Sequence, residues 1–306
     1  MPSHPAARAA LSYTAAAAII WWLLRGVDLT ELAKNLSGAD LRVFLPVVLA
    51  TFLCWFFGEN LLYSRLFSYF HAEISFVEML PVNSVFYSLQ IVNGGVGAGA
   101  MVLMLHKRKG VSWLEGGFAM IFQGFIDFQL QLLMTLAAGL WIGAAPLGLN
   151  LAAVGAAALA WWLPVSFWLR GRPALEAARR LYDWAPMACF RKAGLRHYLV
   201  LMAIRAPMFL MQGLSLYLAL RSFGVRAPLG TVLAVNPAII LLKSLPFAPL
   251  GLGSEQAGIV YGLRAFAPKE TLLAMSLSAS ALNVLFRLVV AALAAPAVLG
   301  FKPPKS

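Results

Sequence analysis

The stretch LRVFLPVVLATFLCWFFGENLLY, from Leu41 to Tyr63, contains Arg42 and Glu59 as its only charged residues. About 20 mainly apolar residues in a helix cross the hydrocarbon core of a bilayer. Further apolar stretches read as spans: Leu11 to Leu24, Leu114 to Ile142, Leu147 to Leu169, Tyr198 to Leu220 and Thr271 to Leu299. The sequence therefore predicts an all-α, polytopic integral membrane protein.

The composition agrees with this class, since 61% of the 306 residues are hydrophobic and 12% are charged. The net charge of +12 would suggest nucleic-acid binding in a soluble protein. Here the basic residues gather in connections between apolar segments, as the positive-inside rule describes for cytoplasmic loops. We therefore expect no nucleic-acid partner, contact with anionic lipid headgroups, and a bacterial inner-membrane protein with both termini in the cytoplasm.

Two further apolar stretches, residues 80–105 and 229–263, are interrupted in the middle by glycine and proline. Glycine weakens a helix and proline removes a backbone donor. The predicted breaks contain Asn93, Gly94, Gly95, Gly97 and Gly99 in the first stretch, and Pro246, Pro249, Gly251 and Gly253 in the second. Each stretch fits a re-entrant helical hairpin, although the distribution of basic loops is also compatible with spanning segments.

The two broken stretches resemble each other, because Leu80-Pro81-Val82-Asn83 matches Leu233-Ala234-Val235-Asn236 and the glycine-rich segments follow at similar offsets. This pattern predicts two halves, residues 1–145 and 146–306, within one membrane domain. Each half would have three spanning helices and one broken re-entrant hairpin. An odd number of crossings inverts the second half relative to the first, as in many transporters.

Ionisable residues inside apolar segments are candidates for a binding site, because burying them in lipid is costly. The candidates for substrate binding are Asp127, Arg205, Lys243, Glu255 and Arg287. Glu59 receives less weight, since it could lie near the membrane surface. A cavity with both signs of charge could bind a phosphate and a positively charged group together, whereas purely structural ion pairs would produce the same set of residues.

No catalytic pattern emerges, so we expect no enzyme activity, no cofactor and no metal site. The histidines have no helical pairing, and Cys54 and Cys189 have neither metal-ligand spacing nor a plausible disulfide geometry. Phosphate-binding and nucleophile-elbow motifs are absent from the sequence. Any uphill transport would therefore need an ion gradient or a partner. We also expect Leu11 to Leu24 to be a retained helix and not a signal peptide.

At three places the chain resembles the flippase-like transmembrane domain family, typified by the membrane part of lysylphosphatidylglycerol synthases. These are Gly94 to Glu115, Gln123 to Asp127, and Leu245 to Glu255 with Arg287 downstream. The resemblance implies two halves with re-entrant helices and movement of lipids between leaflets, such as aminoacylated phosphatidylglycerol or polyprenyl-linked carriers. It does not imply the synthase reaction, which belongs to a separate soluble domain.

The chain departs from the family pattern in its first half, at Gly97-Ala98, Met101-Val102 and Gln123-Gly124, while Glu255 and Arg287 match. The substrate can therefore differ from those best known in the family. The leading hypothesis is a flippase-like or scramblase-like lipid translocator. An ion-coupled carrier of a small soluble metabolite and a non-transporting membrane scaffold are the alternatives, and the oligomeric state is not readable from the sequence.

Overall fold

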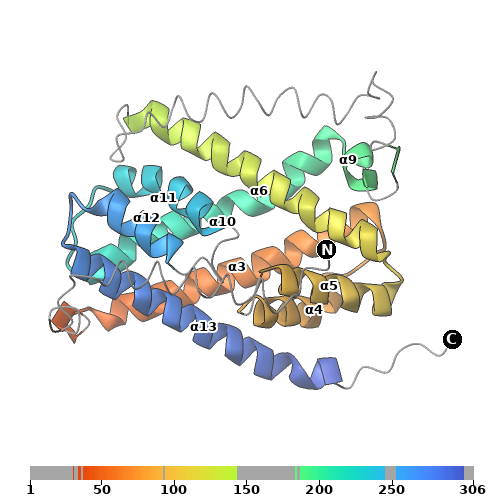
Figure 1. The fold of residues 1–306 in the computed structure, drawn as a ribbon, viewed down its shortest axis with the longest axis horizontal. Helices are drawn as coiled ribbons and strands as arrows, with labels where there is room; N and C mark the ends of the chain where they lie inside the picture. The colour runs from red at the N-terminus through yellow and green to blue at the C-terminus, as the bar shows by residue number, and fades with distance from the viewer. Residues whose placement is uncertain are drawn as a thin grey trace, which may run out of the picture.

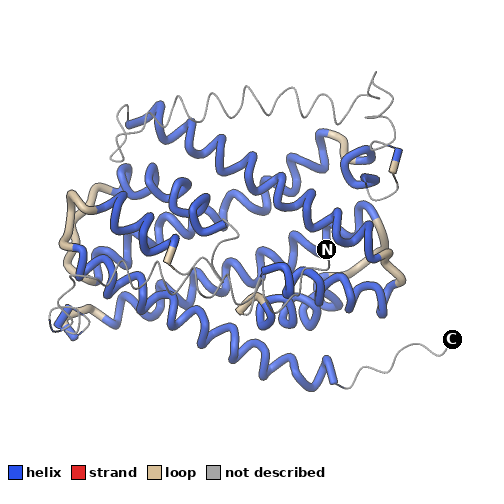
Figure 2. The backbone as a smooth tube through the Cα atoms, viewed as in Figure 1, coloured by secondary structure: helices blue, strands red, loops and turns tan. Residues whose placement is uncertain are grey.

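The computed structural model describes residue 30 and residues 34–35, 37–91, 94–142, 183–184, 187–244 and 253–299. Within these ranges the regular structure is helical, without a strand, and short loops join most consecutive helices (Figures 1 and 2). The helices are α3 (Leu41–Phe70), α4 (Phe76–Leu89), α5 (Gly94–Lys109), α6 (Trp113–Ile142), α9 (Ala188–Lys192), α10 (Leu195–Ser222), α11 (Leu229–Ser244), α12 (Ser254–Leu263) and α13 (Lys269–Leu299).

Four helices, α3, α6, α10 and α13, are long and apolar enough to cross a membrane. They confirm the predicted spans that begin near residues 41, 114, 198 and 271. The 30 residues of α3 extend about 45 Å, more than the roughly 30 Å of a hydrocarbon core. The predicted spans Leu11 to Leu24 and Leu147 to Leu169 lie outside the described residues.

Both broken stretches form pairs of short helices that pack against each other, α4 with α5 and α11 with α12. The 14 residues of α4 and the 16 residues of α5 extend about 21 and 24 Å, so neither helix is long enough to cross the core alone. The Ser75 hydroxyl and the Glu78 carboxylate form a capping box that starts α4. At this same end of the hairpin, where α5 ends beside the start of α4, Lys109 Nζ lies 2.6 Å from Glu78 Oε1.

The predicted glycine break requires a correction, since Gly94, Gly95, Gly97 and Gly99 lie in the first turns of α5 and not in unwound backbone. At Gly97 a Cβ atom would lie 2.8 Å from a backbone oxygen of α4, so the missing side chain permits close packing of the hairpin. This packing compensates for the low helix propensity of glycine.

The other predicted break residues divide between described and undescribed parts of the chain. Gly253 has a φ angle of +88° immediately before α12, a conformation that favours glycine. The remaining predicted break residues lie outside the described residues: Asn93, Pro246, Pro249 and Gly251.

The two predicted halves are interleaved. The helices α3 and α10 pack along each other, α6 of the first half packs on α11 of the second, and α13 of the second half packs on α4 of the first. In Figure 1, α6 and α13 run along opposite sides of the described helices, with α3 and α10 between them. Residues from both halves can therefore meet in the interior.

Two buried asparagines make the same contact in the two halves. Asn83 Nδ2 on α4 donates to the carbonyl oxygen of Phe56 on α3 at 3.0 Å. Asn236 Nδ2 on α11 donates to the carbonyl oxygen of Phe209 on α10 at 3.2 Å, across the same separation of 27 residues. These are the asparagines of the two matching tetrapeptides. Each asparagine thus forms a hydrogen bond between the first helix of a hairpin and the long helix that precedes it in the chain.

Candidate functional site

A central cavity of about 640 Å³ lies among the four long helices and the two hairpins. The residues proposed from the sequence for substrate binding all line it: Asp127, Arg205, Lys243, Glu255 and Arg287. They come from α6, α10, α11, α12 and α13, so the interleaved halves both contribute. The structure thus brings together charged residues that are far apart in the chain.

Polar residues at helical spacing give α6 and α13 one polar face each. Side chains three or four residues apart lie on the same side of a helix. On α6 this face is Gln123, Asp127 and Gln131, and on α13 it is Ser276, Ser280, Asn283 and Arg287. The cavity therefore has two polar walls, although both helices are apolar enough to span a membrane.

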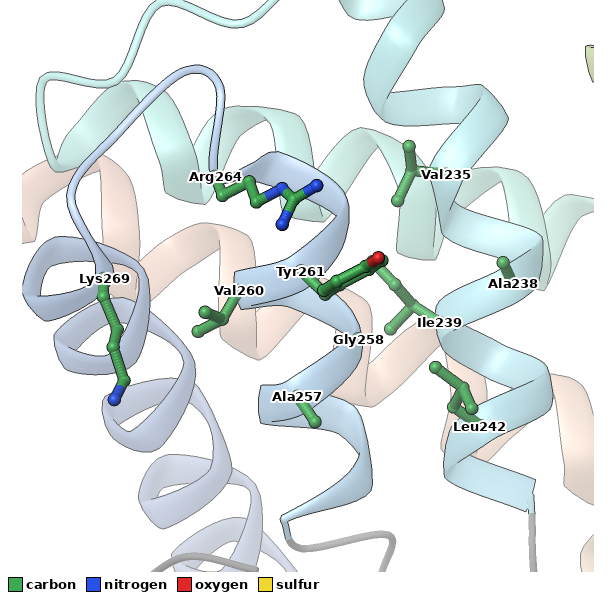
Figure 3. A pocket seen from close by; sticks show the side chains of 10 residues that line it. All are labelled: Val235, Ala238, Ile239, Leu242, Ala257, Gly258, Val260, Tyr261, Arg264 and Lys269. Carbon is green, nitrogen blue, oxygen red and sulfur yellow. The ribbon is translucent and has the colours of Figure 1, made fainter. Parts of the chain in front are cut away.

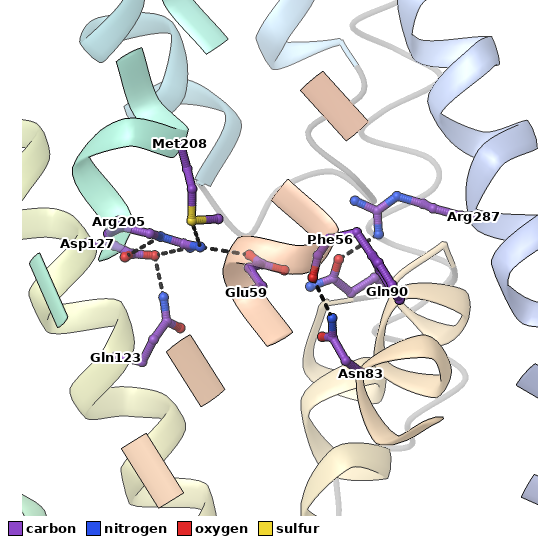
Figure 4. Close-up of polar contacts among 9 residues, drawn as sticks. All are labelled: Phe56, Glu59, Asn83, Gln90, Gln123, Asp127, Arg205, Met208 and Arg287. Carbon is purple, nitrogen blue, oxygen red and sulfur yellow. Dashed lines mark hydrogen bonds and ion pairs between the residues drawn. The ribbon is translucent and has the colours of Figure 1, made fainter. Parts of the chain in front are cut away.

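Arg205 forms the most deeply buried charged group in the cavity. Its Nε donates to Asp127 Oδ1 at 2.7 Å and its Nη2 donates to Asp127 Oδ2 at 2.5 Å. Its Nη1 donates to Glu59 Oε1 at 3.0 Å, and Gln123 donates to Asp127 (Figure 4). The guanidinium carbon also lies 4.7 Å from the ring centre of Trp55. One arginine thus links α10 to α3 and α6.

Glu59 is the main cavity residue to which the prediction from the sequence gives too little weight. Its side chain is 8% exposed and lines the cavity. The signal was present in the sequence, since Glu59 is the only acidic residue between Leu41 and Tyr63. Its partner, however, is on a helix 146 residues further along the chain.

Lys243 and Glu255 form an ion pair that bridges the second hairpin. Lys243 Nζ, near the end of α11, lies 2.9 Å from Glu255 Oε2, in the first turn of α12. A carboxylate near a helix N-terminus is stabilised by the exposed backbone N–H groups and the helix dipole. The Lys243 side chain is 37% exposed, so this pair is more accessible than the Arg205 group.

Arg287 is held by neutral acceptors. Its Nη1 donates to Gln90 Oε1 at 2.6 Å (Figure 4). The same nitrogen donates to the Tyr87 carbonyl oxygen at 3.2 Å, and Nε donates to Asn283 Oδ1 at 2.7 Å. The guanidinium carbon lies 4.6 Å from the Tyr87 ring centre. Among the described residues no carboxylate lies within ion-pair distance of Arg287, so its charge is oriented in the cavity without a counter-charge in contact.

A second hollow of about 460 Å³ lies between α11 and α12 (Figure 3). Its lining is mainly aliphatic, with Tyr261, Arg264 and Lys269 as polar exceptions. The Arg264 guanidinium carbon lies 4.5 Å from the ring centre of Tyr261. None of the residues predicted to bind substrate lines this hollow, so the buried charge is concentrated in the central cavity.

Cys189, His71 and Glu115 are arranged like a nucleophile, a base and an orienting acid, and they lie outside the cavity. Cys189 Sγ is 3.4 Å from His71 Nε2, and His71 Nδ1 is 3.8 Å from Glu115 Oε2. Burial raises the pKa of the Cys189 thiol to about 12, and burial lowers the pKa of His71. The thiol is inaccessible and stays protonated at neutral pH, so the contact is structural and not a nucleophilic site.

Comparison with known proteins agrees with this membrane architecture. No curated protein matches the chain. The family model described as the lysylphosphatidylglycerol synthase TM region matches residues 7–291, nearly the whole length. The chain therefore belongs to the lysylphosphatidylglycerol synthase TM region family.

Proposed function

We propose that this protein is a lipid translocator of the bacterial inner membrane, with both termini in the cytoplasm, and not an enzyme. The observation that carries the proposal is the central cavity, in which helices of both halves present buried charges of both signs. Buried charge in a membrane protein is characteristic of a substrate or ion pathway. Membership of a family named for a lipid synthase supports a lipid as the substrate.

The size of the cavity suits a headgroup. Ligand pockets usually measure about 300 to 1,000 Å³, and this one measures about 640 Å³. A polar headgroup can enter such a space while its acyl chains stay in the bilayer. Arg287 presents a guanidinium that can hydrogen-bond a phosphate, since its hydrogen-bond partners are neutral groups. Substrates that fit are phospholipids, aminoacylated phospholipids and polyprenyl-phosphate-linked lipids.

We further infer that the two halves are inverted repeats that open the cavity to either side of the membrane in turn. The repeated asparagine contacts of α4 and α11 support this inference. So does the reciprocal packing in which α6 covers the hairpin of the second half and α13 covers the hairpin of the first. Inverted repeats around a central site allow alternating access by movement of one bundle against the other.

The two alternatives differ in what they require of the cavity. A scaffold requires buried charges that all pair with one another, yet Arg287 has no carboxylate in contact among the described residues. A carrier of a soluble metabolite requires a site closed to lipid, and a transport assay distinguishes it from a lipid translocator. The lipid proposal is favoured because the family is associated with lipid handling.

The test is a leaflet-resolved assay of fluorescent phospholipids in liposomes that contain the purified protein. Wild type is compared with Arg287→Ala, Arg287→Lys and Glu255→Gln, and with Arg196→Gln, which changes an exposed residue that does not line the cavity. We expect Arg287→Ala to lower the rate at least about tenfold, the effect of losing roughly 1.4 kcal/mol of headgroup binding. Arg287→Lys keeps the charge but loses the forked geometry, so an intermediate rate is expected.

The proposal fails if wild type does not accelerate exchange of neutral, anionic, aminoacylated or polyprenyl lipids, with or without an ion gradient. The metabolite carrier then becomes the better interpretation. If exchange is fast but folded Arg287→Ala and Glu255→Gln proteins match wild type, the lipid function stands and the site assignment is wrong.

A further inference from the structure

The second hollow, of about 460 Å³, is a site separate from the central cavity. Of the residues that line it, only Ile239 also lines the cavity. Its walls are two stripes with the spacing i, i+3, i+4, i+7, one on α11 from Val235 to Leu242 and one on α12 from Ala257 to Arg264. Residues at this spacing lie on one face of a helix. The hollow is therefore an elongated groove, about 10 Å long at 1.5 Å per residue.

The groove is apolar along most of its length and open at the surface. It follows the apolar helix α11, on which Leu242 is 38% exposed. The space exists because Ala238, Ala257 and Gly258 contribute small side chains or none. At Gly258 a Cβ atom would lie only 3.1 Å from Leu242 Cδ1. In a membrane-spanning protein, the apolar molecules that reach such a surface are the acyl chains of lipids.

One end of the groove carries positive charge. Figure 3 shows Arg264 at the end of α12 and Lys269 at the start of the neighbouring helix α13. The Arg264 guanidinium stacks on the ring of Tyr261, an arrangement that orients the group and leaves its N–H donors available to an anion. Among the described residues no carboxylate lies within ion-pair distance of Arg264. Glu270, which follows Lys269, does not line the groove.

The positive end of the groove lies where several helices begin or end. The Asp40 backbone N–H donates to the Ser222 carbonyl oxygen at 2.8 Å, which joins the start of α3 to the end of α10. The loops from α10 to α11 and from α12 to α13 gather at this same end (Figure 2). The 10 residues of α12 extend about 15 Å, half of a hydrocarbon core. The groove therefore runs from the level of the lipid headgroups into one leaflet.

We propose that this groove binds one anionic phospholipid, with its phosphate on Arg264 and one acyl chain along the aliphatic stripes of α11 and α12. Arginine suits a phosphate because its N–H groups form a planar fork. The positive end favours an anionic lipid over a zwitterionic one, whose ammonium group would meet Arg264 and Lys269 as a like charge. This lipid is a bound ligand beside the cavity, so the site does not depend on the translocation proposed above.

The experiment locates the lipid by photo-cross-linking. Full-length protein in detergent micelles receives phosphatidylglycerol with a photoreactive diazirine in its acyl chain, at a concentration well below saturation. We expect cross-links within residues 235–242 and 257–264, and weaker ones from phosphatidylcholine with the same chains. Arg264→Gln should weaken the phosphatidylglycerol cross-links at least about tenfold, the effect of losing one charge-assisted hydrogen bond.

Arg221 provides a matched control at the same end of the protein. It is exposed, its guanidinium carbon lies 5.8 Å from the ring centre of Tyr217, and it does not line the groove. Arg221→Gln removes the same charge, so it should leave the cross-links unchanged. Ala238→Phe fills the groove without a change of charge and should also weaken them. Circular dichroism checks the fold of each variant, and Arg264→Gln decides the matter if Ala238→Phe does not fold.

Three results would overturn the proposal. The first is equal labelling of the groove by the two lipids, or an equal loss in Arg264→Gln and Arg221→Gln. The second is labelling confined to the lining of the central cavity and lost in Arg287→Ala, which would support the proposed function but refute this site. The third is a groove that cross-links to a second copy of the chain and not to lipid. Groove labelling in a protein that does not accelerate lipid exchange would uphold this site while the proposed function fails.

Discussion

Replacing Arg205 with leucine tests the most deeply buried charged side chain among the described residues. The arginine is 4% exposed and holds the carboxylates of Asp127 and Glu59. Removing one partner of a buried ion pair costs about 3 to 5 kcal/mol, because the remaining charge is left uncompensated. We expect Arg205→Leu to lower the free energy of unfolding by at least this amount, a large part of the roughly 5 to 15 kcal/mol that stabilises a typical domain.

The matching triple variant separates lost charge compensation from lost packing. Arg205→Leu combined with Asp127→Asn and Glu59→Gln removes all three charges, so most of the lost stability should return. The control is Arg196→Leu, which changes an exposed arginine on the same helix and should shift stability by no more than about 0.5 kcal/mol.

The assay is reversible unfolding in mixed detergent micelles, followed by circular dichroism. Each variant is compared with wild type at one pH and one detergent composition. The reasoning is refuted if Arg205→Leu costs no more than Arg196→Leu, or if the triple variant is no more stable than the single variant. Either result would mean that the contacts of Arg205 with the two carboxylates do not stabilise the fold.

Three further predictions concern packing and pH. Gly97→Ala should destabilise the first hairpin by about 1 to 3 kcal/mol, because its Cβ would meet a backbone oxygen at 2.8 Å. Gly99→Ala meets open space, so its effect should range from none to a stabilisation of about 1 kcal/mol. The thermal unfolding of the two variants is compared, and equal effects would contradict a packing role for Gly97. Because the folded-state pKa of His71 lies below its usual 6.5, the unfolded chain binds more protons just below that pH. Stability should then fall as pH decreases through 6.5, and His71→Gln should weaken the slope in unfolding titrations. Because the pKa of the Cys189 thiol is raised to about 12, this residue should resist labelling by maleimide at pH 8 in the native protein. The control is a cysteine introduced by Arg196→Cys, which should react. Fast labelling of Cys189, detected by mass spectrometry, would argue against its burial.

The sequence by itself determined the class of the protein and much of its helical plan. Apolar length is a local property, so the spans beginning near residues 41, 114, 198 and 271 could be predicted from hydropathy alone. The interruptions near residues 93 and 250 likewise indicated helical hairpins. The five candidate binding residues could be named because a charged residue within an apolar segment can be recognised from the sequence alone.

Only the tertiary structure decided which of these residues meet. Arg205, Asp127 and Glu59 lie on three helices, and their pairing depends on how α10 packs against α3 and α6. The helical conformation of the glycines in α5 was not predicted either, and at Gly97 the close approach of α4 is a tertiary contact that helix propensity does not record. Propensity and hydropathy act along the chain, whereas compensation of buried charge acts across helix interfaces, and those interfaces exist only once the helices have packed.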